Sequence, residues 1–175
     1  VFVNIGIKNI GSEDAVNITT ILSTDNPYIE ILDATEIFDT IYSGEIIGCN
    51  KAYKIHVSNA IPDQQQVRLD LTATDNQNRS WESKFFFVAS APKLTVGEMI
   101  VNDAEFGNNN GRLDPGETAE IKIKTTNKGH AIAYNVSCSL VAFNQYITVN
   151  TEEQILATLS TFGASYPKFS VTVAD

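Results

Sequence analysis

Residues 3–31 and 121–149 decide the fold, because one stretch repeats the other. The first reads VNIGIKNIGSEDAVNITTILSTDNPYIEI and the second reads IKIKTTNKGHAIAYNVSCSLVAFNQYITV; a shift of 118 residues aligns them without a gap. From Val3 to Tyr42, eleven of forty positions are identical: Ile5, Asn9, Gly11, Ala15, Asn17, Leu22, Asn26, Tyr28, Ile29, Ile37 and Thr40. After a slip of four residues, AYKIHVS also aligns with YPKFSVT. The repeat predicts two copies of one module.

Apolar and polar residues alternate in most segments of the chain. The clearest apolar sets are Val3, Ile5, Ile7; Val16, Ile18; Tyr53, Ile55, Val57; Val67, Leu69, Leu71; and Phe169, Val171, Val173. A period of two is typical of β-strands, whereas an amphipathic helix has a period near 3.6. Turn signals recur about every ten residues, the spacing of an all-β sandwich. We therefore expect an all-β fold with two tandem Ig-like β-sandwich modules.

The expected modules cover residues 1–90 and 91–175, joined through ASAPK, where Pro92 stiffens the link. The first copy begins just after the point where the second carries its Gly- and Asn-rich loop. The second copy ends before any counterpart of QVRLDLTATDNQNRSWESKFFFVA. We therefore expect each module to be truncated at one end, with the missing piece supplied by a longer parent protein. Edge strands left open in this way can pair between copies or between chains.

The composition excludes some partners. The net charge is −9, and the twelve Lys and Arg residues are scattered, so we expect no nucleic-acid binding. No apolar run approaches the ~18 residues that a membrane span needs, so we expect no membrane insertion. Val1 begins inside a predicted strand, which indicates a fragment whose targeting signal lies elsewhere.

The segment FGNNNGRLDPGE, residues 106–117, is a candidate calcium loop. With Gly111 as the sixth position of an EF-hand-like pattern, a glycine falls at the sharp turn and a glutamate at the last position. The first position holds Phe106 in place of an acid, but Asp103 and Glu105 lie close enough to reach in. The candidate ligands are Asp103, Asn108, Asn110, the backbone carbonyl of Arg112, Asp114 and Glu117.

A decorated turn is the alternative, because Asn-Gly and Pro-Gly are turn dipeptides in their own right. A tight turn alone does not need acids at Asp103, Asp114 and Glu117. With so few carboxylates we expect weak binding, with a dissociation constant on the order of 10⁻⁴–10⁻³ M. The bound calcium would be structural, holding the strand LTVGEMIVND against the second module.

The sequence offers no catalytic constellation, and we expect the chain itself not to be an enzyme. His56 alternates with apolar neighbours and His130 follows a turn, so both are expected at the surface. Neither lies at a recognisable spacing from a nucleophile. Cys49 and Cys138 lack ligand spacing, which favours two free thiols over a disulfide. Trp81 shares its parity with Phe85 and Phe87, which predicts a core position and no exposed aromatic platform for sugars.

NNNGRLDPGETAEIKIKTTNKGHAIAYNVSCSL resembles the Ig-like modules found beside catalytic domains in secreted bacterial proteins, including gingipain-like cysteine peptidases. The shared pattern is an Asn-rich loop, Leu-Asp-Pro-Gly-Glu, Asn-x-Gly and Ala-x-Asn-Val, which fall here at 108–111, 113–117, 127–129 and 133–136. The chain is also similar to the CARDB-like group of bacterial modules. The resemblance covers most of both copies and implies a fold and an extracellular setting, secreted or at the cell surface.

These observations lead us to expect a non-catalytic accessory region of a larger secreted bacterial protein. Its role would be that of a stalk or spacer, and its partners would be the other domains of the parent protein. The alternative is an adhesion module that binds carbohydrate or a host protein. An exposed cluster of aromatic side chains on one sheet face would favour that alternative.

Overall fold

The computed structural model describes residues 1–175, and every regular element in it is a β-strand. All neighbouring strands pair antiparallel. Helices are absent, so no helix is available that could span a membrane. The prediction of an all-β fold is confirmed.

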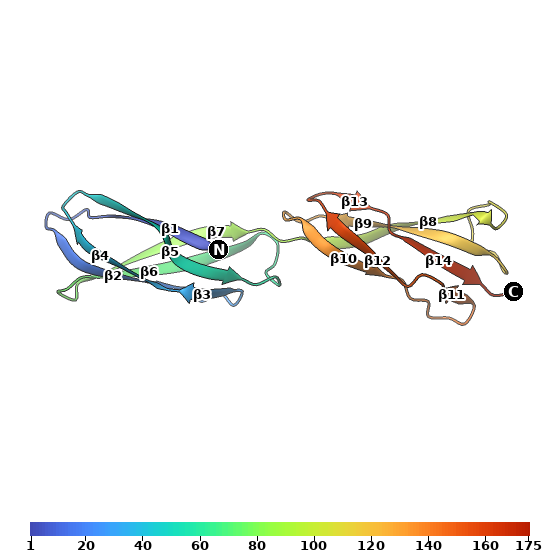
Figure 1. The fold of residues 1–175 in the computed structure, drawn as a ribbon, viewed down its shortest axis with the longest axis horizontal. Coiled ribbons are helices and arrows are strands. Elements are labelled where there is room, and N and C mark those ends of the chain that lie inside the picture. Colours follow the sequence, from blue (N-terminus) through green and yellow to red (C-terminus); the bar gives the residue numbers. More distant parts are fainter. The chain divides into compact units, whose positions relative to one another are not determined.

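The chain divides into two compact units, Val1–Ala89 and Ser90–Asp175. The division lies one residue before the expected boundary. Figure 1 shows the strands of both units in sequence colours. Each unit contains two sheets of its own.

Unit 1 is a sandwich of a three-stranded and a four-stranded sheet. Its strands are β1 (Phe2–Lys8), β2 (Ala15–Ser23), β3 (Ile29–Asp33), β4 (Thr35–Ile41), β5 (Ile46–Val57), β6 (Gln65–Thr74) and β7 (Ser80–Ala89). The strand orders are β1-β5-β3 and β4-β2-β6-β7. Inward-facing residues of both sheets form one core, with Ile18, Phe38 and Ile41 packed against Ile5, Ile7, Ile47, Cys49 and Ala73.

One buried hydrogen bond links the two sheets of unit 1. Tyr53 of β5 is fully buried, and its hydroxyl lies 2.6 Å from the hydroxyl of Thr20 on β2. Thr20 is also fully buried and donates to the carbonyl of Glu36 at 3.1 Å. Burying a tyrosine hydroxyl is unfavourable unless it finds such a partner.

Unit 2 contains a five-stranded and a two-stranded sheet. Its strands are β8 (Leu94–Phe106), β9 (Thr118–Asn127), β10 (Ala133–Ser139), β11 (Ile147–Val149), β12 (Glu153–Leu159), β13 (Ala164–Ser165) and β14 (Lys168–Val173). The orders are β11-β14-β9-β13, with β8 also paired to β9, and β10-β12. Cys138 is half-buried and packs against Ala133, Val136 and Leu159, as its parity predicts. Both cysteines are free thiols.

Strand pairing in the two units follows the same register. Ala15 pairs with Ile41 and Ala133 pairs with Leu159, so adding 118 to one pair gives the other. The same offset relates the left-handed φ angles of Asn17 (52°) and Asn135 (51°). In the later strands the offset falls to 116, since Ile29 pairs with Val57 while Ile147 pairs with Val173. The four-residue slip expected from the sequence is therefore wrong, and the slip is two residues.

One asparagine in each unit, Asn9 or Asn127, makes several hydrogen bonds at the corner where the chain turns into β2 or β10. The amide nitrogen of Asn9 donates to the carbonyls of Glu13 (2.8 Å) and Ile41 (2.9 Å), and its oxygen accepts from the N–H of Gly11 (3.0 Å). Asn127 makes the corresponding bonds to Ala131, Leu159 and Gly129. It accepts one more, from the N–H of Lys93 at 3.0 Å, and is fully buried.

The units differ in which sheet edge is covered. In unit 2, β8 pairs along the outer edge of β9, whereas β1 in unit 1 is an edge strand. In unit 1, β6 pairs with β2 and β7 extends that sheet, whereas β10 in unit 2 pairs only with β12. Each unit therefore has one open edge at the place where the other has a strand.

The core position predicted for Trp81 is wrong. Trp81 is 48% exposed and Phe85 is 44% exposed, and nearly all of β7 is open to solvent. Their shared parity does place both side chains toward the β1 side of unit 1. That side has no strand beyond β1 to cover them, so they line a groove.

Candidate metal-binding loop and groove

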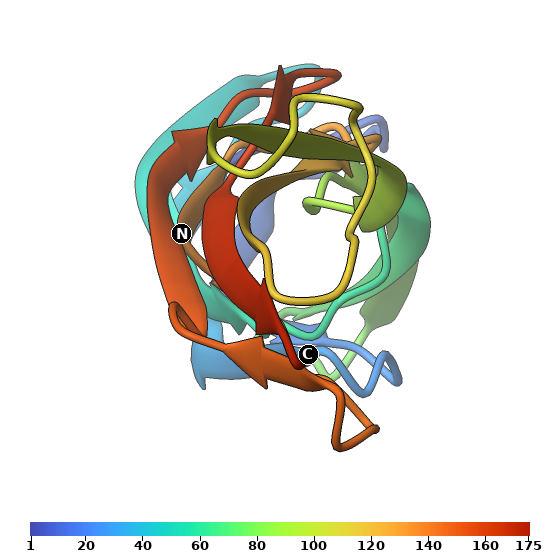
Figure 2. The ribbon, with the colours of Figure 1, turned by 90° about the vertical axis from the view of Figure 1, so that its right-hand side faces the viewer.

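Loop 107–117 connects β8 to β9. In Figure 2 this segment is yellow and faces the viewer, close to the C-terminus. The N–H of Gly116 donates to the carbonyl of Val173 at 3.2 Å, and the N–H of Val173 donates to the carbonyl of Glu117 at 2.9 Å. The pairing of β8 with β9 is irregular between Asn102 and Phe106, and Asp103 falls in that irregular part. The irregularity allows Asp103 to turn inward.

Asp103 organises the loop from beneath. Its side chain is 1% exposed, and its two oxygens accept from the N–H groups of Gly111 (3.0 Å) and Asn110 (2.9 Å). Burial alone would raise the pKa of Asp103, but these donors lower it below its ordinary value. The carboxylate therefore stays ionised inside the loop. Phe106, at the first position of the expected pattern, is 66% exposed.

The two asparagines turn their amide nitrogens toward Asp114. One oxygen of Asp114 accepts from the side chains of Asn108 (2.9 Å) and Asn110 (2.6 Å). These bonds lower the pKa of Asp114, aided by the charge of Arg112 and opposed by partial burial. The asparagine oxygens accept from backbone N–H groups two residues on, at Asn110 (3.1 Å) and Arg112 (2.8 Å).

Glu117 closes the loop at its C-terminal end. Its carboxylate accepts from the N–H groups of Asn108 (2.9 Å) and Asp114 (3.4 Å). Gly111 has a φ of +75°, a conformation that favours glycine, as expected for the sharp turn. A Cβ on Gly107 would lie 2.8 Å from the carbonyl oxygen of Asp103, so only glycine fits beside the buried acid.

The structure thus gathers Asp103, Asn108, Asn110, Asp114 and Glu117 into one hydrogen-bonded loop. It does not bring in Glu105, which is exposed. Arg112 joins through its backbone N–H. No group of three or more His, Cys, Asp and Glu side chains in the chain is arranged to hold a metal ion. The candidate ligands include both carboxylates and asparagine amides. The two amide oxygens accept hydrogen bonds from backbone N–H groups in this structure.

The two histidines lie as predicted, near the surface. His56 pairs with Glu30 across β5 and β3, with 3.7 Å between its Nδ1 and the carboxylate, and both side chains are largely exposed. The ring of His130 meets that of Phe162 edge to face at 5.1 Å between centroids.

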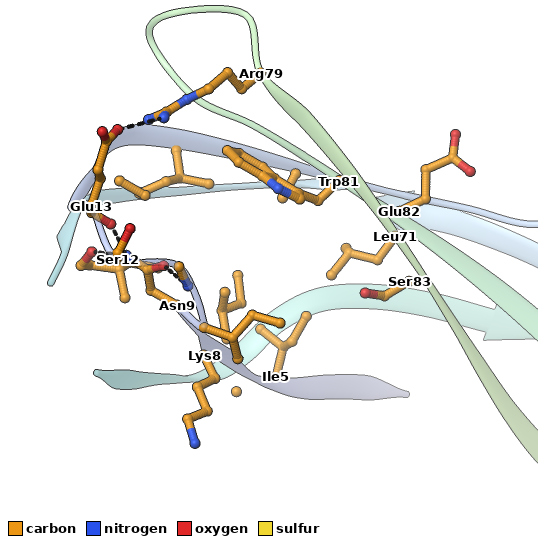
Figure 3. A pocket seen from close by; sticks show the side chains of 18 of the residues that line it. Ile5, Lys8, Asn9, Ser12, Glu13, Leu71, Arg79, Trp81, Glu82 and Ser83 are labelled. Atoms are coloured by element: carbon orange, nitrogen blue, oxygen red, sulfur yellow. Dashed lines mark hydrogen bonds and ion pairs between the residues drawn. The ribbon is translucent and has the colours of Figure 1, made fainter. Parts of the chain in front are cut away.

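Sequence reasoning missed a groove in unit 1. It measures about 600 Å³ and lies beside β1, with β6 and β7 on its other side (Figure 3). Its apolar lining is formed by Ile5, Ile7, Ile18, Ile41, Leu71, Ala73, Trp81 and Phe85. The alternation along β7 indicated the face on which Trp81 and Phe85 lie, but it carried no signal of whether that face is covered.

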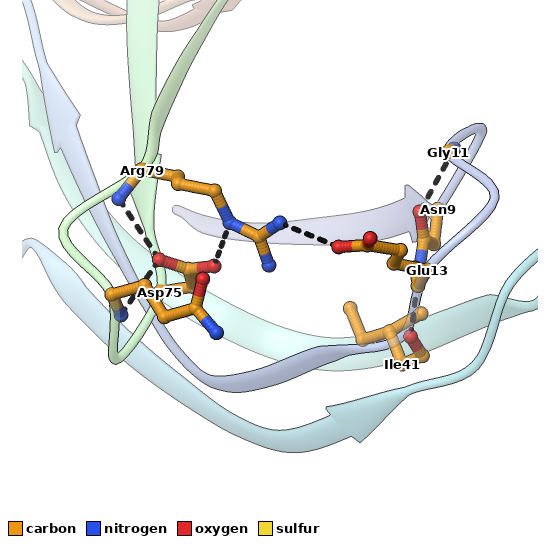
Figure 4. A network of polar contacts seen from close by, with 7 residues as sticks. Asn9, Gly11, Glu13, Ile41, Asp75 and Arg79 are labelled. Carbon is orange, nitrogen blue, oxygen red and sulfur yellow. Dashed lines mark hydrogen bonds and ion pairs between the residues drawn. The ribbon is translucent and has the colours of Figure 1, made fainter.

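A polar network braces one end of this groove (Figure 4). Asp75 is buried and accepts from the Arg79 side chain at 2.6 Å and from the N–H of Gln77 at 2.9 Å. Burial would raise the pKa of Asp75, but these bonds lower it below its ordinary value. Arg79 also forms an ion pair with Glu13, with 3.2 Å between a guanidinium nitrogen and a carboxylate oxygen. Its guanidinium carbon lies 5.8 Å from the centroid of the Trp81 ring.

The fold and the sites define an all-β protein of antiparallel sandwich architecture. A scan against known protein families found no match, and neither did a search of curated proteins.

Proposed function

We propose that residues 1–175 form a non-catalytic accessory region of a larger secreted or cell-surface bacterial protein, where two Ig-like modules act as a spacer. The observation that carries the proposal is the division into two compact units, each with its own pair of sheets. Units that fold around separate cores can be placed in series without losing stability. The resemblance to modules that accompany gingipain-like cysteine peptidases supports the extracellular setting.

The spacer role is tested in the larger protein by exchange. Replacing residues 1–175 with an unrelated pair of β-sandwich modules of equal length should preserve the surface activity of the parent protein. Deleting the region should lower that activity, because the active domain loses its distance from the envelope. Loss of activity in the exchanged protein would contradict a purely spatial role.

Calcium binding by loop 107–117 is part of this proposal. The ligands would be Asp103, Asn108, Asn110, the carbonyl of Arg112, Asp114 and Glu117. The ionised, buried Asp103, held in the same hydrogen-bonded loop as Asp114 and Glu117, supports it, since calcium prefers several oxygen ligands around a sharp turn. To bind, the two amides would exchange their N–H contacts with Asp114 for oxygen contacts with the cation.

Thermal unfolding with calcium, with magnesium and with EDTA tests the site. With a dissociation constant of about 10⁻⁴–10⁻³ M, 10 mM calcium should stabilise unit 2 by roughly 1.4–2.7 kcal/mol. Each kcal/mol of this stabilisation should raise the Tm of unit 2 by about 4–8 °C. Asp114→Ala and Glu117→Ala should abolish the rise, while Glu105→Ala is the matched control because its side chain is exposed. An unchanged Tm in calcium would reduce the segment to a turn.

A second candidate function is binding of carbohydrate or a protein. The exposure of Trp81 and Phe85 in the groove favours it, because half-buried aromatic rings beside an apolar groove are typical of binding surfaces. The expectation that no such aromatic cluster exists is not met in unit 1.

A further inference from the structure

Strand β7 forms a long and regular outer edge of unit 1. It ends the sheet β4-β2-β6-β7 and pairs with β6 over ten consecutive residue pairs without a bulge. The carbonyls of Arg79 and Ala89 accept hydrogen bonds, at 3.1 and 2.9 Å, from N–H groups at the two ends of β6. Hydrogen-bonding direction alternates along an antiparallel strand, so the even-numbered residues of β7 direct their N–H and C=O groups away from β6. These residues are Ser80, Glu82, Lys84, Phe86 and Val88.

This edge is separate from the one that β8 covers in unit 2. β8 pairs with β9, the counterpart of β1, and so extends the sheet that corresponds to β1-β5-β3. On the face of β7 opposite Trp81 and Phe85, the side chains of Phe86 and Val88 are 60% and 55% exposed. The exposure of these two side chains does not depend on what covers β1. β7 also contains neither proline nor glycine, the residues that commonly interrupt an edge.

The charges of β7 distinguish it from the other edge strands. β4, β8 and β12 carry acidic side chains and no basic one, so two copies of any of them would repel each other. The pairing of β8 with β9 is also irregular in two places. β7 carries one acid and one base, Glu82 and Lys84, which are both exposed and share one face of the strand. It is the only edge strand with both charges.

Pairing of β7 with itself has one register in which these charges match. With Ser83 on a two-fold axis, Glu82 lies opposite Lys84 of the second copy, and the symmetry repeats this pair. Both residues are even-numbered, as hydrogen-bonded pairs at this edge must be. With Glu82 or Lys84 on the axis, like charges would face each other, which is unfavourable. On the other face, Trp81 lies opposite Phe85 of the second copy, a favourable aromatic pair.

We infer that β7 pairs antiparallel with β7 of a second copy of this chain, so that two four-stranded sheets join into one continuous sheet. Backbone hydrogen bonds supply the affinity, and the pairs between Glu82 and Lys84 fix the register. One strand from each copy makes a small interface, so we expect a dissociation constant on the order of 10–100 µM. The inference concerns unit 1 and is independent of the spacer and calcium proposals.

Sedimentation velocity with the full chain tests for the dimer. Between about 1 µM and 1 mM, the protein should pass from monomer to dimer. Hydrogen exchange at the two ends of this range should show protection that rises with concentration at the amides of Glu82, Lys84 and Phe86. The amides of β1 and β10 should show no such change.

Charge reversal tests the register. Glu82→Lys and Lys84→Glu each place like charges opposite each other twice, so each should weaken dimerisation about tenfold or more. An equimolar mixture of the two variants should dimerise again, because every pair in the mixed dimer joins an acid to a base. Glu152→Lys and Lys128→Glu are the matched controls, since they change the net charge equally at exposed positions of unit 2 and should leave dimerisation unchanged.

Three results would overturn the inference. The first is a chain that stays monomeric at about 1 mM. The second is a dimer that Glu82→Lys does not weaken. The third is concentration-dependent protection at β1 or β10 in place of β7. Glu82→Lys faces Thr72 on β6, so it keeps the test decisive if Lys84→Glu, which faces Asp70, unfolds unit 1.

Discussion

At the scale of single residues, Asn9 and Asn127 show how one side chain can serve several backbone groups. Each bridges two carbonyls and an N–H group at the corner before β2 or β10. The two residues differ in burial. Asn127 is fully buried and also accepts a hydrogen bond from the N–H of Lys93. The pattern Asn-x-Gly, visible in the sequence, therefore marks a backbone junction.

Asn127→Ala should lower the free energy of unfolding of unit 2 by about 2–4 kcal/mol, because it leaves buried backbone groups without partners. Asn9→Ala should cost unit 1 less, since water can reach its half-buried corner. Urea unfolding, followed by hydrogen exchange in each unit, measures both losses. Equal losses would show that burial of the asparagine does not determine how much free energy of unfolding the substitution removes.

Low pH should weaken both units through their buried acids. Asp75 in unit 1 and Asp103 in unit 2 have pKa values lowered in the folded state. Their stabilisation is therefore present above the unfolded carboxyl pKa of about 3.9 and is lost as pH falls through the lower folded-state value. Asp103→Asn should flatten the acid side of the stability profile of unit 2 only, measured by hydrogen exchange between about pH 5 and 2. A parallel change in unit 1 would contradict this assignment.

At the scale of strands, sequence alternation predicted which segments pair but not how far each sheet extends. Val16 and Ile18 predicted β2, and the repeat predicted β10 with the same register. Parity also identified the face on which Trp81 lies. It could not reveal that this face is uncovered, because cover depends on a strand beside β1 and not on β7 itself.

The loop was predictable in its residue types and less so in its contacts. Asp103 was a candidate because it lies three residues before the pattern begins, and the structure places it under the turn. Glu105 lies nearer in sequence, one residue before the pattern, but it is exposed, whereas Asp103 falls in the irregular pairing between Asn102 and Phe106 and turns inward. The two-residue slip in the later strands was also out of reach of the sequence, since short apolar runs align in more than one way.

The open edge of β10 should be visible in hydrogen exchange. Residues 19–23 of β2 pair with β6, whereas the equivalent residues 137–141 have no strand on that side. Amides of 137–141 that face away from β12 should exchange much faster than their equivalents in β2. Peptide-resolved exchange by mass spectrometry makes this comparison within one sample. Equal protection would mean that another segment covers β10.

At the scale of the whole molecule, separate cores should give separate unfolding. Tyr53→Phe removes the bond to Thr20 while keeping the ring, so it should cost unit 1 about 1 kcal/mol. The free energy of unfolding of unit 2 should not change, because distant sites without shared partners act additively. Hydrogen exchange in each unit provides the measurement, and a matching loss in unit 2 would indicate a single cooperative structure.

Trp81 is the only tryptophan in the chain, and it stands half-exposed at the rim of the groove. Indole emission shifts to the blue when water is removed from the ring, and six tyrosines do not respond at that wavelength. The protein therefore contains its own optical reporter at the position where cover is missing. A segment that covers β1 and β7 should therefore shift the emission maximum of Trp81 to shorter wavelength, and no added label is needed to detect it.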